Sequence, residues 1–422
     1  IGPFWERQEM ANMEFMAVRP FFSETSDESQ KKIVRDYLWP IGTTRIRGDD
    51  EYWRFLCFFG HNFEVNKDDG RYRTIIFPIT AWGRDIKGRF YLAAFPFGGR
   101  LREFLGRDEL DFVLFPLYME SSVNSIVTRD FLWPIVSWSR GKDIHRFRIF
   151  PFYGFSSIED RWKKSFVLWP IWTYAHYYMP YEQGRAFILF PLIGNISTTK
   201  QKGWMLLPPF FKWARSEKRH EINCPWPFIQ YASGDLDKLY LWPIVGRQAV
   251  GHSKDRFILW PLIQMQEGST GESIFKRTMV LPFLFHESHY AKTSQQAGSR
   301  YFKVWPLLSY ERKLDESRVR IPSLWPLKNI RGIEQNWAPL WTIYEHISTT
   351  NEVDENILWG IWKRRSSPEE SRFVLFPLFD IQKTADKTTK WSILKGIIGW
   401  ENTREIKKLR IFYLFSIKSK QK

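Results

Sequence analysis

Short apolar runs alternate with polar segments along the whole chain, and most of the runs share one phrase. The phrase is apolar-aromatic-proline-apolar, and it recurs about every nineteen residues. Clear copies are Leu38-Trp39-Pro40-Ile41, Leu114-Phe115-Pro116-Leu117, Leu168-Trp169-Pro170-Ile171, Leu259-Trp260-Pro261-Leu262 and Leu375-Phe376-Pro377-Leu378. Self-similarity at a short fixed period indicates one supersecondary unit that is copied many times.

The repeat around Pro261 shows what one unit is expected to be. Residues 257–263 are all apolar and lie between the charged residues 254–256 and a polar segment that ends at Gly271. Such a run, rich in aromatic and β-branched types, predicts a strand buried on both faces. A proline at its centre excludes a helix. The motif is therefore expected at mid-strand and Trp260 in the core.

The junctions between units predict hairpins, as at Ser233-Gly234-Asp235. Two copies carry glycine in place of proline, Leu358-Trp359-Gly360-Ile361 and Leu394-Lys395-Gly396-Ile397. With these copies the chain holds about 22 units. We expect a single all-β domain over residues 1–422, a repetitive antiparallel up-and-down meander of about 22 strands. Propeller-like or barrel-like closure is expected because it removes exposed edges.

Composition adds a strong basic character. The 422 residues are 44% hydrophobic and 18% aromatic, with a formal net charge of +16. This charge favours anionic partners. Lys and Arg are spread over nearly every segment between repeats, which indicates a basic surface and makes nucleic acid an unlikely partner. No stretch of eighteen apolar residues without a charge occurs, so no transmembrane helix is expected.

The sequence contains no phosphate loop, nucleophile elbow or zinc spacing, so no catalytic, cofactor-binding or metal-binding residue is predicted. His286-Glu287-Ser288-His289 is expected to be a surface loop. Glu120, Glu345 and Asp380 are candidate carboxylates for glycoside hydrolysis, but nearly every unit has an acid near its turn. Cys57 and Cys224 are expected to be buried thiols, with a long-range disulfide left as the alternative.

Four tryptophans are candidates for ligand contact because they lie just past the motif and nearer the loops. They are Trp82, Trp138, Trp172 and Trp213. Aromatic faces at such positions suit sugar rings or other planar groups. Partly buried packing explains the same residues and stays open as the alternative.

Two segments near the start of the chain are similar to segments of a known group of proteins. They are Met16-Ala17-Val18-Arg19-Pro20-Phe21-Phe22-Ser23 and Asp36-Tyr37-Leu38-Trp39-Pro40-Ile41. The chain resembles a group of repetitive envelope proteins of Gram-negative bacteria, often predicted as lipoproteins, with many Leu-Trp-Pro-Leu or Leu-Phe-Pro-Leu copies. The resemblance implies export to the periplasm or outer membrane. It brings no catalytic residues.

These patterns together predict a non-enzymatic, exported structural or interaction protein of the cell envelope. Its basic loops would face a protein partner or an anionic envelope component, either lipid or polysaccharide. Two alternatives remain open, a glycan-binding or glycan-cleaving β-propeller and an outer-membrane β-barrel.

Overall fold

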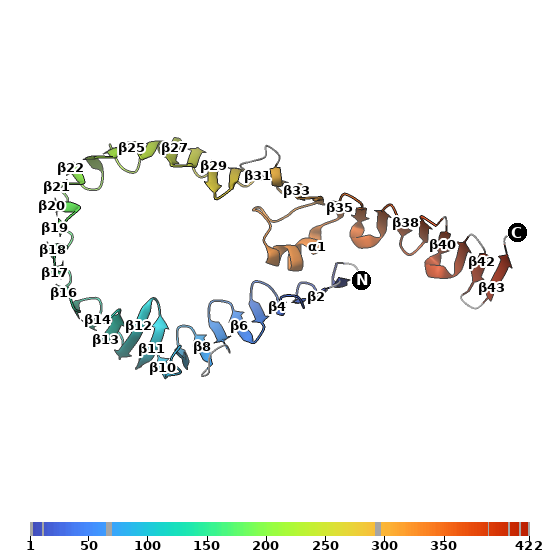
Figure 1. Ribbon diagram of the computed structural model, residues 1–422, viewed down its shortest axis with the longest axis horizontal. Helices are drawn as coiled ribbons and strands as arrows, with labels where there is room; N and C mark the ends of the chain where they lie inside the picture. Colours follow the sequence, from blue (N-terminus) through green and yellow to red (C-terminus); the bar gives the residue numbers. More distant parts are fainter. Residues whose placement is uncertain are drawn as a thin grey trace. The chain divides into compact units, whose positions relative to one another are not determined.

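The computed structural model describes residues 3–10, 12–64, 70–291, 297–386, 388–403, 406–412 and 415–420. Nearly all of them lie in strands and tight turns, as Figure 1 shows. The chain divides into two compact units. Unit 1 comprises Ile1–Glu9, Phe15–Ser23 and His252–Lys422, and unit 2 comprises Met10–Glu14 and Glu24–Gly251.

The strands of the first part of the chain are short and follow one another closely. They are β1 (Trp5–Met10), β2 (Met13–Val18), β3 (Phe22–Asp27), β4 (Lys32–Tyr37), β5 (Gly42–Arg47), β6 (Asp50–Phe55), β7 (Phe59–Glu64), β8 (Arg71–Ile76), β9 (Thr80–Arg84), β10 (Phe90–Ala94), β11 (Gly98–Phe104), β12 (Arg107–Val113), β13 (Tyr118–Val123), β14 (Ile126–Phe131), β15 (Val136–Arg140), β16 (Ile144–Ile149), β17 (Tyr153–Ile158), β18 (Trp162–Val167), β19 (Trp172–Met179), β20 (Glu182–Leu189), β21 (Ile193–Thr198), β22 (Gln201–Leu206), β23 (Phe211–Ser216), β24 (Arg219–Asn223), β25 (Ile229–Gly234), β26 (Leu236–Leu241) and β27 (Val245–Val250).

The rest of the chain continues in the same way, with one longer insertion that holds a π-helical turn (Ile333–Trp337) and α1 (Ala338–Trp341). Its strands are β28 (Ser253–Ile258), β29 (Ile263–Thr270), β30 (Ser273–Val280), β31 (Leu284–Ala291), β32 (Ala297–Val304), β33 (Leu308–Lys313), β34 (Glu316–Ile321), β35 (Tyr344–Ser348), β36 (Val353–Ile357), β37 (Trp362–Ser366), β38 (Glu370–Leu375), β39 (Phe379–Thr384), β40 (Thr389–Ile393), β41 (Ile398–Asn402), β42 (Ile406–Ile411) and β43 (Phe415–Lys420).

The all-β, antiparallel meander is confirmed, whereas the strand number and the closure were wrong. The described residues form 43 strands, and the meander is not closed into a propeller or a barrel. The repeat of about nineteen residues was identified correctly. However, each repeat contains two strands, because the chain reverses inside the apolar run as well as between the runs. The expectation of a single domain over residues 1–422 stays a prediction.

The proline motif forms a hairpin turn and does not lie at mid-strand. In residues 168–171 the Trp169–Pro170 peptide is cis, and the N–H of Ile171 donates to the carbonyl of Leu168 at 2.7 Å. This is a type VI β-turn, which has a cis proline at its third position. Leu168 has φ 47° and directs the chain into the turn. The seven-residue apolar runs therefore contain a strand end, a turn and the next strand's start.

The two glycine copies reverse the chain by another turn type. Trp359 has φ 56° and ψ 33°, and Gly360 has φ 94°. Ile361 N–H donates to the Leu358 carbonyl at 3.2 Å. Positive φ at both central positions is the type I′ hairpin turn, which needs Gly or a residue tolerant of that conformation. Lys395 and Gly396 repeat the arrangement with φ 56° and 99°.

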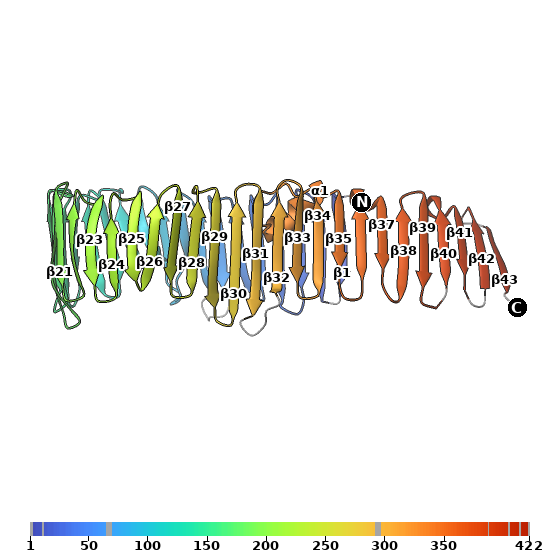
Figure 2. The ribbon, with the colours of Figure 1, turned by 90° about the horizontal axis from the view of Figure 1, so that it is seen from above.

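Apolar turns and polar turns alternate along the described strands. In unit 2 each connection from an even-numbered strand to the next strand is apolar, and the connections that follow odd-numbered strands are mostly polar or contain glycine, as at Asn124-Ser125. Unit 1 repeats the pattern, except that three of its connections after even-numbered strands also contain charged residues: residues 19–21, 322–343 and 394–397. Antiparallel pairing therefore gathers the apolar turns along one margin of each unit's sheet, where one set of strand ends lies, and the polar turns along the opposite margin (Figure 2). We call the first the apolar edge. In unit 2 it comprises residues 38–41, 56–58, 77–79, 95–97, 114–117, 132–135, 150–152, 168–171, 190–192, 207–210, 224–228 and 242–244.

Neighbouring apolar turns bind one another. The N–H of Trp169 donates to the carbonyl of Pro151 at 2.7 Å, and the N–H of Leu168 donates to that of Phe152 at 2.6 Å. The aromatic rings follow the same path, since the ring centroids of Phe150 and Trp169 are 5.4 Å apart. The hydrogen-bond ladder of the sheet thus continues into the turns.

The motif tryptophans are half-exposed or partly buried, and none of those described is buried, which corrects the expectation of a core position. Trp169 is 50% exposed and Trp260 is 48% exposed. Buried apolar side chains come from the strands instead. One buried cluster contains Ala81, Tyr91, Ala93, Leu101, Phe112 and Met119.

The cysteines also lie in apolar turns, and strand-like positions were expected for them. Cys57 is exposed, Cys224 is partly buried, and both thiols are free. The predicted burial is therefore wrong for Cys57.

Trp260→Ala should reduce the free energy of unfolding by about 1–2 kcal/mol, because half of the indole ring is already accessible to water. Phe257→Ala, three residues earlier, should cost about 3–5 kcal/mol because that side chain is only 9% exposed. Urea denaturation of both variants measures the difference. Equal losses would show that the turn tryptophan behaves as a core residue.

Candidate functional site

Strand register divides the side chains of unit 2 between two faces. We call face A the face that carries two cross-strand rows. One row runs through Asp130, Ser137, Arg148, Gly154, Phe166 and Thr173, and the other through Thr128, Ser139, Arg146, Ser156, Lys164 and Ala175. The intervening side chains point to the opposite face, which we call face B.

Face A carries many small side chains. Gly154, Ala175, Ala186, Gly194, Gly203 and Ala214 all occur on it. A Cβ atom at position 154 would lie 2.3 Å from the Phe166 ring, so a larger residue there would require this ring to shift. Small residues on one face suit a sheet that curves toward that face, and Figure 1 shows that the strands of unit 2 follow a curve.

A groove of about 970 Å³ lies on face A between β12 and β23. Trp133 and Trp169 reach it from two apolar turns, and Phe166 and Tyr177 line it from the strands. Four residues with hydroxyl groups also line it: Thr128, Ser137, Ser139 and Ser156. The groove therefore offers both apolar surface and hydrogen-bonding groups.

The charge of the groove is mainly positive. Arg107, Arg146, Arg148, Lys164 and Lys212 line it, and Asp130 is the one carboxylate among its described lining residues. Lys212 is neutralised by Glu221 at 2.5 Å, and Arg107 donates to Ser121 at 2.5 Å.

Arg146 and Lys164 are the most available of these cations. Both side chains are exposed, and Ser156 lies between them in the register. Among the described residues Arg146 has no ion-pair partner. Lys164 contacts the rings of Trp162 and Tyr177, at 4.6 Å and 5.5 Å from their centroids. Cation–π contacts orient the ammonium group without neutralising it.

Arg148 supplies a third positive group beside them. It lies 3.9 Å from the buried carboxylate of Asp130. Its Nε atom is buried and has no hydrogen-bond partner in the part of the chain that the structure describes. Buried donors are nearly always satisfied, so this atom is an exception among the described residues of the groove.

The four tryptophans predicted from sequence lie apart from this groove. Register places Trp82, Trp138, Trp172 and Trp213 on face B, one each on β9, β15, β19 and β23. Trp138 stacks on Phe131, and Trp172 stacks on Phe187. The structure does not bring the four together, and ligand contact by them stays a prediction.

Trp213 lines a hollow of its own. Together with Trp204, Lys202, Arg215 and His220 it borders a depression of about 400 Å³ on face B. This smaller site shares the combination of aromatic and basic side chains. Unlike the groove on face A, this site has no buried polar atom without a hydrogen-bond partner among its described residues.

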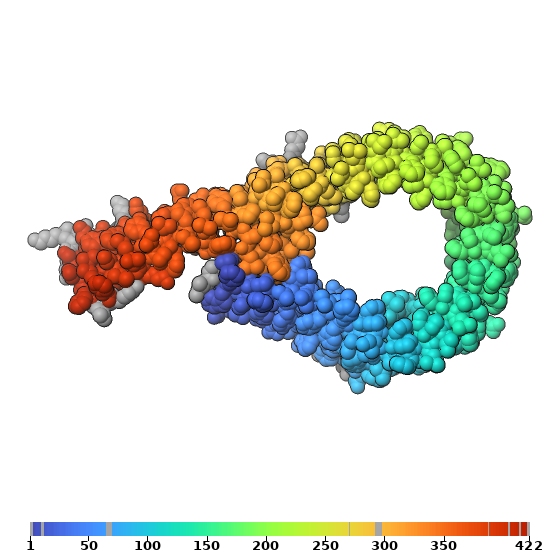
Figure 3. All heavy atoms as spheres, turned by 180° about the vertical axis from the view of Figure 1, so that it is seen from behind, coloured from blue at the N-terminus to red at the C-terminus, as the bar shows by residue number. Residues whose placement is uncertain are grey.

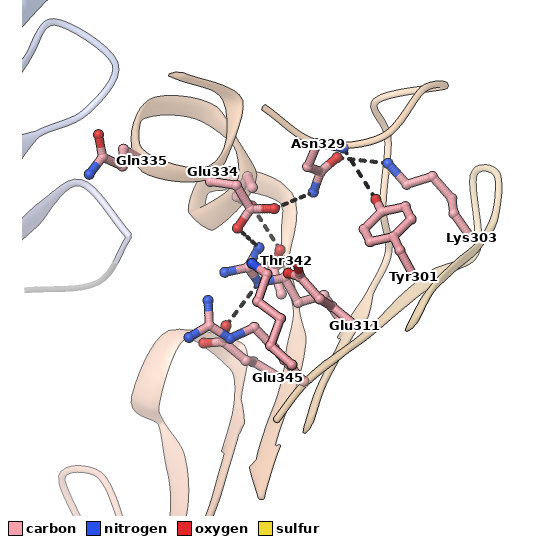
Figure 4. A network of polar contacts seen from close by, with 12 residues as sticks. Tyr301, Lys303, Glu311, Asn329, Glu334, Gln335, Thr342 and Glu345 are labelled. Carbon is pink, nitrogen blue, oxygen red and sulfur yellow. Dashed lines mark hydrogen bonds and ion pairs between the residues drawn. The ribbon is translucent and has the colours of Figure 1, made fainter. Parts of the chain in front are cut away.

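In unit 1, the insertion of residues 322–343 is held to the sheet by a polar network, which Figure 4 shows from close by. The ammonium group of Lys303 is fully buried and donates to the carbonyls of Trp325 and Leu327 and to Asn329 Oδ1, at 2.7–2.8 Å. Burial lowers the pKa of Lys303 to about 8. Arg320 pairs with both Glu334 and Glu345 nearby.

The same insertion contacts the start of the chain within unit 1. Arg19 is 3% exposed and its Nε donates to the carbonyl of Gln335 at 2.6 Å. It also pairs with Glu6. Residues separated by most of the sequence are thus joined by side-chain contacts.

Glu287 lies in β31, which corrects the expectation of a surface loop at residues 286–289. Its carboxylate is buried and binds Lys328 at 2.6 Å, Arg277 at 2.7 Å and His289 at 3.1 Å. Although burial alone would raise the pKa of Glu287, these donors lower it to about 2. Lys328 belongs to the insertion, so this ion cluster is a second attachment for it.

The candidate glycosidase carboxylates are separated and engaged in ion pairs. Glu120 pairs with Arg129, Glu345 with Arg320, and Asp380 with Arg372. Hydrogen bonds from Arg129 and Tyr118 lower the pKa of Glu120. No two of the three share a strand pair.

Sequence reasoning missed Arg146, Arg148 and Lys164. The sequence pattern that could have identified them is the two-residue spacing of Arg146 and Arg148, which places both on one face of a strand. Gly154 and Lys164 then follow on the same face. That pattern needs the strand boundaries, which the mid-strand interpretation of the motif had shifted.

Comparisons with models of protein families and with curated proteins found no match for this chain. Within the described residues, no helix has the length and apolar character needed to cross a membrane.

Lys303→Met should lower the stability of unit 1 by about 3–5 kcal/mol, because three acceptors lose the charged donor that is buried between them. Faster proteolytic cleavage within residues 322–343 would report release of the insertion. Lys313→Met is the matched control, since that side chain is 69% exposed. Unchanged cleavage in the Lys303 variant would contradict the proposed attachment.

Glu287→Gln should be less stable than the wild type by about 2–3 kcal/mol at pH 7. The folded pKa lies below the unfolded value of about 4.3, so this stabilisation is complete above the unfolded pKa and disappears as pH falls toward 2. Denaturant titrations at several pH values should therefore converge at low pH. Glu272→Gln, at an exposed turn position, should show no such pH-dependent difference.

Proposed function

We propose that this protein is a non-enzymatic structural and binding protein of a Gram-negative cell envelope, and that it holds an anionic glycan in the groove on face A. The observation that carries the proposal is the set of available cations, Arg146, Arg148 and Lys164, in a groove that also contains hydroxyl groups and aromatic rings.

The chemistry of an acidic polysaccharide suits this combination. Its carboxylate or phosphate groups pair with Arg and Lys, and Arg binds both groups in bidentate geometry. Its hydroxyl groups exchange hydrogen bonds with Ser and Thr. The apolar faces of its sugar rings pack on aromatic side chains such as Trp133 and Trp169.

The dimensions of the site suit a chain molecule more than a small ligand. The groove spans strands from β12 to β23, with Arg146 and Arg148 on β16 and Lys164 on β18. An elongated polyanion contacts several such positions at once, and each contact adds to the attraction that the net charge of +16 already provides.

The exported location is part of the proposal and rests on the resemblance of the repeated motif to envelope proteins. Cell fractionation with an antibody against the chain tests it. Recovery in the cytoplasmic fraction would contradict the proposed location while leaving the binding chemistry open to its own test.

Removing both exposed cations, in Arg146→Gln/Lys164→Gln, should weaken binding to an acidic polysaccharide by about tenfold per charge. A charged hydrogen bond contributes about 1.5–3 kcal/mol, and 1.4 kcal/mol corresponds to a factor of ten. Isothermal titration with polygalacturonate measures the change, and neutral dextran serves as the uncharged comparison.

The chain offers a matched control on face B. Lys163 and Arg185 are exposed and lie in one cross-strand row with His176 between them. Lys163→Gln/Arg185→Gln removes the same charge from the opposite face, so it should bind like the wild type. Equal weakening in both double variants would show non-specific attraction to the basic surface and would contradict a site in the groove.

A further inference from the structure

The apolar edge of unit 2 has a composition that the proposed glycan site does not explain. In unit 2 neither the apolar connections nor the strand residues directly beside them carry a charge. Many of their side chains are exposed, among them Phe77, Ile79, Phe97, Phe152 and Leu192. Exposed apolar patches of this extent mark an interaction surface.

The edge is continuous along the unit. Aromatic residues of successive turns touch, as with Phe95, Phe115 and Trp133, whose neighbouring ring centroids are 5.4 Å and 5.6 Å apart. Figure 3 shows the atoms of unit 2, coloured from blue to yellow-green, as an unbroken band.

Two residues away from the apolar connections of unit 2, the charged side chains that are accessible to solvent are all positive. Arg54, Arg148 and Lys212 lie two residues from an apolar connection and are exposed or half-buried. Lys212 is paired with Glu221 and Arg148 lies 3.9 Å from Asp130, whereas Arg54 has no ion-pair partner among the described residues. The carboxylates at equivalent positions, Asp36 and Asp130, are buried. Asp36 accepts a hydrogen bond from Thr43 at 2.9 Å. An apolar edge whose border exposes arginine and lysine side chains and buries its carboxylates complements an anionic lipid surface.

We propose that the apolar edge of unit 2 inserts into the interface of an anionic lipid bilayer. The turns and one strand residue on each side form an apolar layer about 5–7 Å deep, at about 3.3 Å per strand residue. Amphipathic elements that lie in a membrane interface bury their apolar face to about 5–10 Å. The depth thus fits one interface and not a full crossing.

The backbone of the edge favours lipid over a protein partner. The N–H groups of Leu132 and Trp133 donate to the carbonyls of Leu117 and Pro116 in the preceding turn, at 2.9 Å and 2.8 Å. Because these groups are already paired, they enter hydrocarbon at little cost. A protein interface usually forms about one hydrogen bond per 100–200 Å², which this edge is poorly equipped to supply.

Vesicle binding tests the proposal with the full chain. Phosphatidylcholine vesicles that contain phosphatidylglycerol should bind the wild type in a flotation assay. The triple variant Ile79→Glu/Phe97→Glu/Leu192→Glu should lower the lipid partition coefficient by about a hundredfold, because it places charge on three inserted side chains. These side chains are exposed, so circular dichroism and melting temperature should stay unchanged.

The polar edge provides the matched control. Ile86, Leu105 and Tyr181 are exposed apolar side chains at that edge. Ile86→Glu/Leu105→Glu/Tyr181→Glu adds the same three charges, and it should bind vesicles like the wild type. Brominated lipids should quench tryptophan fluorescence in the wild type and the control, and not in the apolar-edge variant.

Three outcomes would overturn the proposal. The apolar-edge variant could bind vesicles as well as the wild type, or both triple variants could lose binding equally. In the third outcome, no protein floats with vesicles, and sedimentation shows a concentration-dependent dimer that only the apolar-edge variant abolishes. That result would assign the edge to a second copy of the chain.

Discussion

The hydrogen bond between successive apolar turns is the interaction on which the rest of the structure depends. A long antiparallel meander has many reversals, and each reversal could leave unpaired backbone groups. Here Trp133 donates to Pro116, and Trp169 donates to Pro151, so each turn is fixed by the one before it. Proline occupies the position in the turn where no N–H is needed. Strands of five to eight residues then suffice, because the ladder does not stop at their ends.

Two strands per repeat then determine where chemistry can occur. The chain returns to the same edge after every second strand, so equivalent positions of successive repeats share both an edge and a face. This places Arg146, Ser156 and Lys164 in one row of face A, although they are up to eighteen residues apart (164 − 146). Small residues such as Gly154 leave the space that the groove occupies. Groove and apolar edge are therefore two consequences of one periodicity.

The sequence was sufficient for the repeat, the all-β class and the antiparallel order, because these follow from periodicity and turn chemistry alone. It was insufficient for the strand number, because an apolar run such as residues 257–263 looks the same whether it continues straight or reverses at Pro261. Locating face A needs strand boundaries correct to one residue, since a shift of one residue exchanges the faces. The groove cations were missed for this reason, and Trp213 was chosen from the opposite face.

The glycine copies separate what the fold requires from what the motif adds. At Leu394-Lys395-Gly396-Ile397 the chain reverses without an aromatic residue or a proline, and the N–H of Ile397 still donates to the Leu394 carbonyl at 3.3 Å. The next apolar turn, which contains residue 412, is bonded to this turn as in the proline copies, since the N–H of Phe412 donates to the carbonyl of Ile397 at 2.7 Å. Reversal and ladder therefore do not depend on tryptophan. Half-exposed aromatic residues at most of the other apolar turns need a reason beyond chain reversal, and the surface that they form together supplies one.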